Sequence, residues 1–181
     1  MKKINEIFYS LQGEGYHTGT PAVFVRFSGC NLTCDFCDMQ HQEGVLMTDD
    51  QIVSEVKKHP ASVVILTGGE PSLFVDEALV DQLHQAGLYL CMETNGTRPV
   101  PAAVDWITCS PKPGASLGIQ RMDEVKVVYT GQDISVYEGL PASHFFLQPC
   151  SGLNTVETVE YILSHPKWRL SLQTHKLIDI P

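Results

Sequence analysis

The chain has 181 residues, of which 43% are hydrophobic and 18% charged, and its formal net charge is -9. This balance excludes a disordered chain and suits a single globular domain spanning residues 1–181. With only 12 Lys and Arg residues and no basic cluster, a nucleic-acid partner is not expected. The sequence has no apolar run of bilayer length, and its start lacks the apolar core of a signal peptide. We therefore expect a cytoplasmic protein that acts on a small molecule and has no membrane partner.

Runs rich in β-forming residues recur along the chain and alternate with helical patterns. This alternation favours parallel strands joined by crossover helices. We predict an α/β fold, an incomplete (partial) β/α barrel of about six or seven mostly parallel strands. The predicted strands are 23–27, 63–67, 88–94, 106–110, 124–129, 145–148 and 169–173.

Three helices are predicted between these strands, at 48–59, 72–86 and 154–165. Thr48 with Gln51, and Asn154 with Glu157, have the spacing of residues that cap the start of a helix. Gly87 follows the second helix, at a position where glycine commonly ends one.

Polar motifs follow six of the predicted strands, at the point where each strand ends. The carboxyl ends of parallel strands meet at one edge of the sheet, where α/β folds build their sites. We therefore expect these motifs to form one site. They are Cys30–Cys37, Gly68-Gly69-Glu70, Glu93-Thr94-Asn95-Gly96, Ser110-Pro111-Lys112, Gln148-Pro149 and Gln173-Thr174-His175.

Three cysteines with C-x3-C-x2-C spacing, Cys30, Cys34 and Cys37, follow the first of these strands. Three thiolates can hold three irons of a 4Fe-4S cubane and leave the fourth iron open to an exogenous ligand. A zinc site completed by His41, or buried structural thiols, are the alternatives. The spacing favours the cluster over both.

The surroundings of the cysteines resemble the radical S-adenosylmethionine (SAM) superfamily. Phe36 precedes the last cysteine, and Gly-Gly-Glu-Pro follows the next strand. The resemblance implies that Phe36 lies against the adenine and that Gly68, Gly69 and Glu70 meet the methionine amino group. It also implies that SAM is bound by Ser110 and Lys112, which would receive the methionine carboxylate, and by Gln148. Taken alone, these residues would pass as a βα turn and a solvated lysine.

From about residue 4 onward the chain resembles the 7-carboxy-7-deazaguanine synthase family. The Gln-Gly-Glu-Gly sequence at 12–15 and the Gln-Thr-His-Lys sequence at 173–176 carry this resemblance. It implies conversion of 6-carboxy-5,6,7,8-tetrahydropterin to 7-carboxy-7-deazaguanine with loss of ammonia, on the route to queuosine and other 7-deazapurines. A 5′-deoxyadenosyl radical formed from SAM would take hydrogen from the substrate's C6. After the ring contracts, hydrogen would return and SAM would be regenerated as a cofactor. An external, flavodoxin-like electron donor and a homodimer are also implied.

Two other functions remain open on the residues alone. A glycyl-radical-enzyme activase would use the same cluster and cofactor on a protein substrate. A zinc-binding module would not be an enzyme at all. The sequences at 12–15 and 173–176 speak against the activase.

On the substrate side, Arg26 interrupts an apolar strand, and alternation places it on the face of Phe24. A buried guanidinium needs a partner, and a substrate carboxylate suits its forked donors. An internal salt bridge to Glu14 or Glu93 is the alternative. Glu14, between two glycines, could bring its carboxylate against the pterin's guanidine-like edge, or be an exposed hairpin charge.

Further substrate contacts follow only from the resemblance. Gln12, Gly13, Asn95 and His175 would contact the pterin. Pro181 could bring its terminal carboxylate to the pocket, although chain ends commonly fray.

Magnesium is the point where the sequence departs from the family pattern. The family commonly has a threonine after Cys-Asp, and its oxygen binds the ion; here the sequence is Cys37-Asp38-Met39. A thioether is a poor ligand for Mg2+, which prefers oxygen. The ion is therefore held by Asp38 or Gln40, held by substrate and water, or absent.

The remaining cysteines and tryptophans are interpreted as packing residues. Cys91, Cys109 and Cys150 lie in or beside apolar strands and are expected in the core. Trp106 and Trp168 begin strands. Four further histidines are expected to be solvated: His59, His84, His144 and His165.

Overall fold

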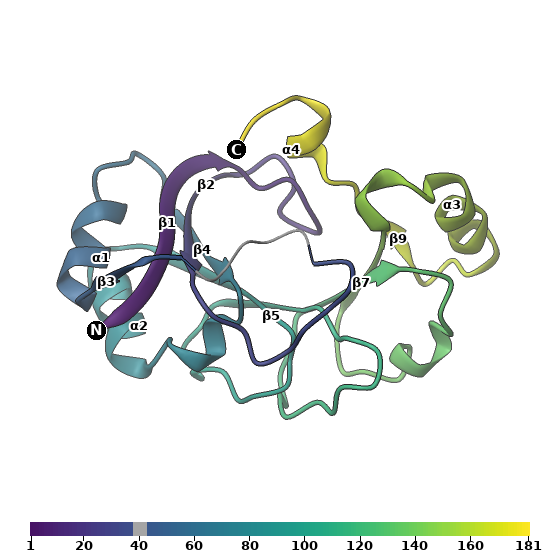
Figure 1. Cartoon of the computed structure of the whole chain (residues 1–181), viewed down its shortest axis with the longest axis horizontal. Helices are drawn as coiled ribbons and strands as arrows, with labels where there is room; N and C mark the ends of the chain where they lie inside the picture. The colour runs from purple at the N-terminus through teal and green to yellow at the C-terminus, as the bar shows by residue number, and fades with distance from the viewer. Residues whose placement is uncertain (38–42) are drawn as a thin grey trace.

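The computed structural model describes residues 1–37 and 43–181. Within them one sheet of nine strands, in the order β3-β1-β2-β4-β5-β6-β7-β8-β9, curves around a central space (Figure 1). From β2 onward in this spatial order, through β4 to β9, neighbouring strands pair in parallel. At the other edge, β1 pairs antiparallel with both β2 and β3. The strands are β1 (Lys2–Leu11), β2 (Pro21–Phe27), β3 (Val45–Met47), β4 (Val63–Gly68), β5 (Tyr89–Thr94), β6 (Trp106–Cys109), β7 (Glu124–Tyr129), β8 (His144–Pro149) and β9 (Arg169–Leu170).

The prediction of a partial barrel is confirmed, and each of the seven predicted strands has its counterpart in the parallel part of the sheet. The strand number was too low because β1 and β3 were missed. Both are antiparallel strands near an edge, where exposed positions interrupt the apolar pattern. Lys2 in β1 is even buried, because its ammonium pairs with Asp49 at 2.6 Å and Asp76 at 3.1 Å.

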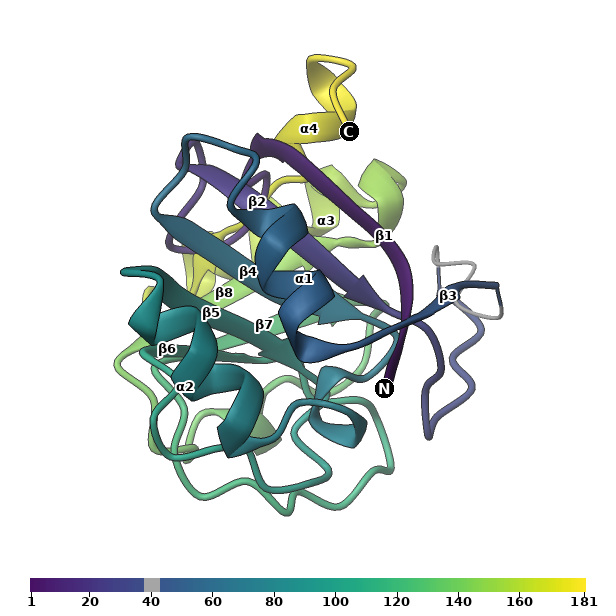
Figure 2. The same cartoon turned by 90° about the vertical axis from the view of Figure 1, so that its left-hand side faces the viewer.

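Helices cover the outer face of the sheet. Figure 2 shows α1 and α2 side by side on that face, and α3 lies against β8 and β9 at the far end. No helix in the described part of the chain is long and apolar enough to cross a membrane. The helices are α1 (Asp49–Val56), α2 (Glu77–Gln85), α3 (Thr155–Ser164) and α4 (Thr174–Leu177), with 3-10 turns η1 (Pro71–Leu73), η2 (Ser135–Tyr137) and η3 (Cys150–Gly152).

The helix starts agree with the sequence in one case and differ in two. The Thr48–Gln51 capping box is present and opens α1. The predicted helix 72–86 is split, because the η1 turn comes first and Asp76 caps α2. Asn154 precedes α3 but does not cap it; its side chain instead accepts a hydrogen bond from the Cys150 N–H at 2.8 Å.

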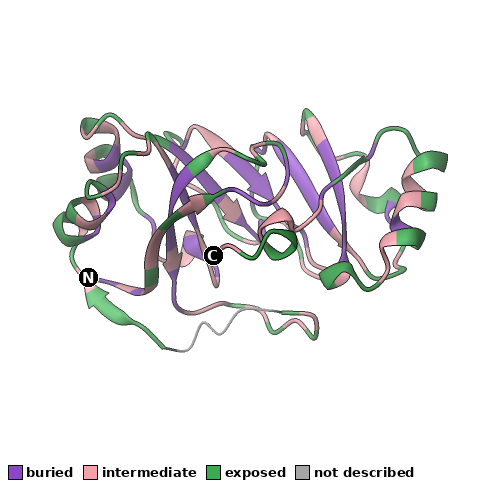
Figure 3. Cartoon of the chain, turned by 90° about the horizontal axis from the view of Figure 1, so that it is seen from above, coloured by how far each residue is buried: buried purple, intermediate pink, exposed green. Residues whose placement is uncertain are grey.

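Alternate residues of the strands face two different environments. In β2, Val23, Val25 and Phe27 belong to the core under the helices, whereas Phe24 belongs to a smaller inner cluster with Ile65. Figure 3 shows the central strands largely buried, β3 exposed, and the outer faces of the helices exposed. The inner face of the barrel is therefore free to carry polar side chains near the carboxyl edge.

Candidate active site

A cavity of about 250 Å³ opens at the carboxyl edge of the parallel strands. With one exception, Glu70, the predicted site residues that the structure describes all line it. Asp38, Gln40 and His41 lie outside the described residues. The predicted residues in the lining are Gln12, Gly13, Glu14, Arg26, Cys30, Cys34, Phe36, Cys37, Gly68, Gly69, Asn95, Ser110, Lys112, Gln148, His175 and Pro181.

The three cysteines of the motif lie on one loop after β2. None of the three forms a disulfide; Cys30 and Cys34 are half-buried and Cys37 is exposed. The Cys37 N–H donates to the Cys34 carbonyl at 3.1 Å, which folds the loop. Burial raises the pKa of the Cys34 thiol, and the nearby Lys112 ammonium opposes that shift. A bound cation would favour the thiolate further.

The donor set suits a cluster better than a single metal ion. Across residues 1–37 and 43–181, no three His, Cys, Asp or Glu side chains converge as a single ion would require. In a cubane each thiolate binds a different iron, so its sulfurs stand further apart. Three thiols on one side of a cavity, with room beyond them, meet that need.

The Gly68-Gly69-Glu70 turn packs directly on the cysteine loop. The Glu70 N–H donates to the Gly29 carbonyl at 2.9 Å, and a Cβ on Gly69 would lie 2.1 Å from that same oxygen. Glycine is therefore required at 69 for the two loops to meet. Gly68 and Gly69 line the cavity with backbone atoms.

The Glu70 side chain turns away from the cavity and is fully buried. Its carboxylate accepts hydrogen bonds from the Thr94 hydroxyl at 2.6 Å, the Asn95 N–H at 2.7 Å and the Ser72 N–H at 3.0 Å. In this position the carboxylate joins the end of β4 to the end of β5. A contact between the motif and a methionine amino group would then fall to the backbone of Gly68 and Gly69.

The Lys112 side chain is held by hydrogen bonds within the protein and is not simply solvated. Its ammonium donates to the Ser110 carbonyl at 2.9 Å and hydroxyl at 2.7 Å, and lies 5.9 Å from the centre of the Phe36 ring. Burial lowers the pKa of Lys112, while Cys34 acts in the opposite direction. The residues that the resemblance assigns to carboxylate and adenine binding therefore lie together beside the cysteines.

A second charged group, which the sequence analysis missed, lies on the inner face of β7. The Lys126 ammonium pairs with Glu14 at 2.5 Å and with Glu93 at 3.2 Å, and its side chain is 5% exposed. Burial alone would lower the pKa of Lys126, but Glu14, Glu93 and Glu124 raise it, so the lysine stays charged. Burial likewise acts to raise the pKa of Glu14, but Lys126 and Gln173 bring it below its ordinary value. Glu14 is thus not an exposed hairpin charge.

Arg26 shares the inner face with Phe24, as predicted, and both line the cavity. Its guanidinium is only half-buried and pairs with Glu6 at 2.5 Å, while lying 4.7 Å above the Phe8 ring. Arg26 is therefore less buried than expected, and its partner is neither Glu14 nor Glu93. The alternation of β1, which was not predicted as a strand, is what brings Glu6 alongside.

The end of β1, the loop after it and the last residues of the chain close the cavity on its remaining side. The Thr174 N–H donates to the Gly13 carbonyl at 3.0 Å, and the Ser10 hydroxyl donates to the main-chain oxygen of Pro181 at 2.9 Å. A Cβ on Gly13 would lie 2.1 Å from Nδ1 of His175. Figures 1 and 2 both show α4 and the last residues beside the end of β1.

Comparison with known proteins agrees with this geometry. The family model described as the Radical SAM superfamily matches residues 24–129. The 7-carboxy-7-deazaguanine synthase of Bacteroides thetaiotaomicron is 74% identical over 180 residues, covering 99% of both chains. The same enzyme of Bordetella pertussis is 42% identical, covering 98% of both. The crystal structure of QueE from Escherichia coli superposes with a TM-score of 0.79 at 27% identity, covering 94% of this chain and 93% of that one.

The chain belongs to the 7-carboxy-7-deazaguanine synthase family. It is a radical SAM lyase, so the activase and the zinc-binding module are set aside. Membership of the radical SAM superfamily implies a 4Fe-4S cluster and SAM as its cofactors. The three thiols and the cavity beside Lys112 fit that pair of groups.

Other side chains of this synthase-family chain depart from the sequence-based interpretation. Cys91 and Cys109 are buried as expected, and burial raises the pKa of each to about 12. Cys150 is not a core residue, because it is half-buried and lines the cavity. His84 is paired with Asp105 at 2.9 Å and is therefore not simply solvated.

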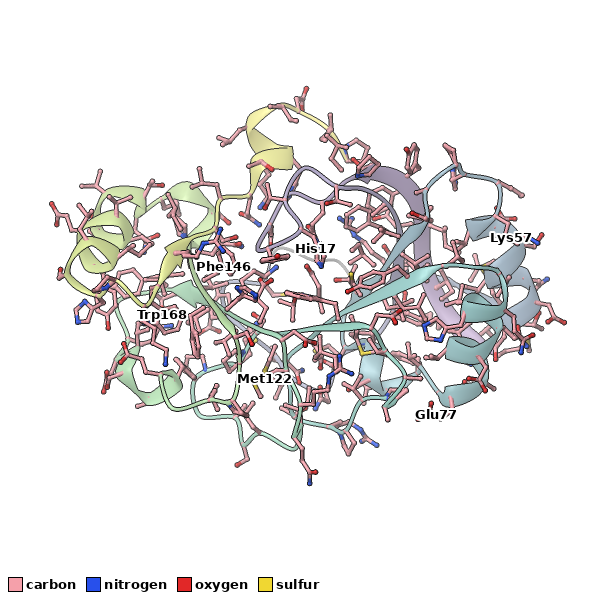
Figure 4. All side chains as sticks on the ribbon, turned by 180° about the vertical axis from the view of Figure 1, so that it is seen from behind. His17, Lys57, Glu77, Met122, Phe146 and Trp168 are labelled. Atoms are coloured by element: carbon pink, nitrogen blue, oxygen red, sulfur yellow. The ribbon has the colours of Figure 1, made fainter. Side chains whose placement is uncertain are left out.

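A group of aromatic and histidine side chains fills the opposite end of the barrel. The Tyr16 ring stacks on Trp106 at 4.7 Å, and His144 lies 5.6 Å from Trp106. His17, on the same loop as Tyr16, lies toward the middle of the ring of strands (Figure 4). The loop after β1 thus closes this end of the barrel below Glu124 and Lys126. Trp168 is buried, as expected of a packing residue.

Proposed function

We propose that this chain converts 6-carboxy-5,6,7,8-tetrahydropterin to 7-carboxy-7-deazaguanine with loss of ammonia, within queuosine or another 7-deazapurine pathway. One observation carries the proposal: a single cavity has three thiols at one side and a cluster of charged hydrogen-bonding groups at the other. The first side suits a SAM-binding cluster. The second suits a flat, hydrogen-bonding heterocycle that bears a carboxylate.

When bound, the cluster and SAM supply the radical that starts the reaction. The chain orients SAM through Phe36 at the adenine, Lys112 and Ser110 at the carboxylate, and the backbone of Gly68 and Gly69 at the amino group. Glu70 supports that backbone from behind. Gln148 completes this side; its carbonyl accepts from the Ser171 hydroxyl at 2.9 Å, so its amide N–H groups remain available as donors.

On the other side, Arg26 is the donor for the substrate carboxylate, with Glu6 holding the guanidinium in place. Glu14 accepts from the donor edge of the pterin. Gln12, Asn95 and His175 line the cavity within reach of the ring, and Gly13 gives close backbone approach. Pro181, whose main-chain oxygen accepts from the Ser10 hydroxyl, is a further acceptor at the rim.

Anaerobic incubation of the reconstituted protein with SAM, a reductant and the carboxypterin tests the proposal. We expect mass spectrometry to detect 7-carboxy-7-deazaguanine and released ammonia. Cys34→Ala is the matched negative control, and Cys91→Ala, which removes a core thiol outside the cavity, is the positive one. A wild-type protein that cleaves SAM but leaves the carboxypterin unchanged would overturn the assignment of substrate.

Magnesium is proposed to matter less here than in relatives that have a threonine in place of Met39. The support is chemical. The side chain of Met39 offers a thioether sulfur and no oxygen, and Mg2+ prefers oxygen ligands. Magnesium titration should therefore change turnover little in the wild type and more in Met39→Thr. A strong response in the wild type that disappears in Asp38→Asn would assign the ion to Asp38, and Gln40→Ala tests the other candidate in the same way.

We also propose the surroundings in which the enzyme works. Residues 1–181 form one domain, since one sheet runs from Lys2 to Leu170. A cluster beside the exposed Cys37 suits reduction by an external, flavodoxin-like donor, and a thiolate-held cluster suits the reducing cytoplasm. A homodimer is supported by apolar side chains exposed on and beside α3, namely Leu153, Val156 and Leu163. Analytical ultracentrifugation tests the dimer.

A further inference from the structure

The buried Lys126 is held by two carboxylates that line the proposed substrate side of the cavity. Its ammonium contacts Glu14 at 2.5 Å and Glu93 at 3.2 Å, and the other donors to these carboxylates are side chains too. Gln173 donates to Glu14 at 2.9 Å, Gln12 to Glu93 at 3.0 Å. The Thr67 hydroxyl completes the set, donating to Glu93 at 3.2 Å.

A count of donors and acceptors shows what this group offers to a ligand. A carboxylate has about four lone-pair positions. The described donors take two positions of Glu14 and three of Glu93. The lone pairs that remain unused on these two carboxylates can only accept hydrogen bonds, and both side chains line the cavity.

The charge of Lys126 is what keeps both side chains as acceptors. Without a cation, two carboxylates that share one partner would repel each other in a poorly hydrated site, and the pair would take up a proton. A protonated carboxyl group presents an O–H donor where an acceptor stood. Glu14 and Glu93 form one wall of the cavity. Lys126 thus determines whether this wall presents hydrogen-bond acceptors or donors, although the lysine need not touch the substrate.

We propose that Lys126 is a positioning residue that determines specificity, holding Glu14 and Glu93 as paired anionic acceptors so that the cavity selects a 2-amino pyrimidinone edge and rejects a 2-oxo edge. The inference rests on the proposed pterin substrate. A 2-amino group and the adjacent ring N–H are donors that match the wall. A 2-oxo group would place an acceptor against a carboxylate where the 2-amino donor stood. The adjacent ring N–H would keep its hydrogen bond, but the one made by the 2-amino group would be lost.

The experiment compares two unreactive, oxidised ligands, 6-carboxypterin and 6-carboxylumazine, which differ in having a 2-amino or a 2-oxo group. Their dissociation constants are measured by ligand fluorescence, on anaerobic enzyme that carries the cluster and SAM but has no reductant. We expect wild type to favour the pterin by roughly a hundredfold or more, because sites built around a donor reject its replacement strongly. The readout is this ratio and not the affinity alone.

Lys126→Met should reduce the ratio at least tenfold, mainly by weakening the pterin, while iron content and SAM affinity stay at wild-type levels. Lys126→Arg keeps a cation and should keep the preference. Lys58→Met, which removes an exposed lysine beside α1, is the matched control. Should Lys126→Met fail to fold, Glu14→Gln tests the same wall, because its amide nitrogen introduces a donor at the carboxylate position and should also reduce the ratio.

The outcomes separate this inference from the function on which it rests. A merely structural Lys126 would weaken both ligands equally and leave the ratio unchanged, which would overturn the inference. A ratio that survives Glu14→Gln would overturn it as well. If the wild type binds neither ligand, the proposed substrate itself is wrong.

Discussion

The Glu70 carboxylate is the element of the SAM motif whose role the structure changes most, and Glu70→Gln tests it. The side chain is 0% exposed and accepts three hydrogen bonds, two of them from the backbone N–H groups of Asn95 and Ser72. Those two N–H groups point at different carboxylate oxygens. A glutamine must place its NH2 group on one of these oxygen positions. Either orientation therefore sets a donor against a buried backbone donor.

An unsatisfied buried N–H costs about 1–3 kcal/mol. In a protein of this size, each kcal/mol lowers the melting temperature by about 2–4 °C, so we expect Glu70→Gln to lower it by roughly 2–12 °C. Differential scanning under anaerobic conditions measures the shift on the cluster-bearing protein. Glu160→Gln, on the exposed face of α3, is the matched control and should shift by less than about 1 °C, since exposed substitutions cost little.

The same variant separates a supporting role from direct contact with SAM. If the carboxylate turned into the cavity to bind the amino group, Glu70→Gln would weaken SAM binding and leave the melting temperature near that of the wild type. That result would refute the interpretation of Glu70 as a support for β4 and β5. A lower melting temperature in the folded variant, with SAM affinity changed less than tenfold, would agree with it.

Three further predictions concern the rest of the cavity. Cys30→Ala should abolish the cluster, measured as iron per chain, whereas Cys91→Ala should keep it. Arg26→Lys should raise KM for the carboxypterin almost as much as Arg26→Ala, about ten- to a hundredfold, because both variants lose the planar, forked guanidinium. An unchanged KM in Arg26→Ala would show that Arg26 does not belong to the substrate site. Burial raises the pKa of Glu124 to about 7, with Lys126 opposing, so its neutral form is favoured by folding. That contribution to the free energy of unfolding is full below pH 4.5 and is lost as the pH rises to about 7. Over this range the free energy of unfolding should therefore fall by about 2–3 kcal/mol less in Glu124→Gln than in the wild type. Parallel curves of unfolding free energy against pH for the two proteins would contradict the pKa shift.

The sequence predicts the parallel part of the sheet because strands buried on both faces form continuous apolar runs. The same logic failed for β1, whose Lys2 and Glu6 break its apolar pattern. Both charges are explained only by partners distant in sequence: Asp49 and Asp76 for Lys2, and Arg26 for Glu6.

The site was predictable to the extent that its residues follow strand ends. That rule brought Cys30, Ser110 and Gln148 to one cavity from widely separated positions. It could not find Lys126, which lies inside the strand sequence EVKVVY and pairs with Glu14, 112 residues away. The available signal was a lysine between valines in a strand that otherwise reads as buried, since a buried lysine requires a partner.

The proposed substrate side of the cavity combines residues inside the superfamily match, such as Arg26, Asn95 and Lys126, with segments outside it. The superfamily match, residues 24–129, contains the cysteine loop and the residues proposed for the amino and carboxylate groups of SAM. Several proposed substrate residues lie outside it, in segments 10–15 and 173–181. These segments are joined to each other directly, through Thr174 to Gly13 at 3.0 Å and Gln173 to Glu14 at 2.9 Å. Because a Cβ at Gly13 would meet the His175 ring, a change in one segment must be matched in the other.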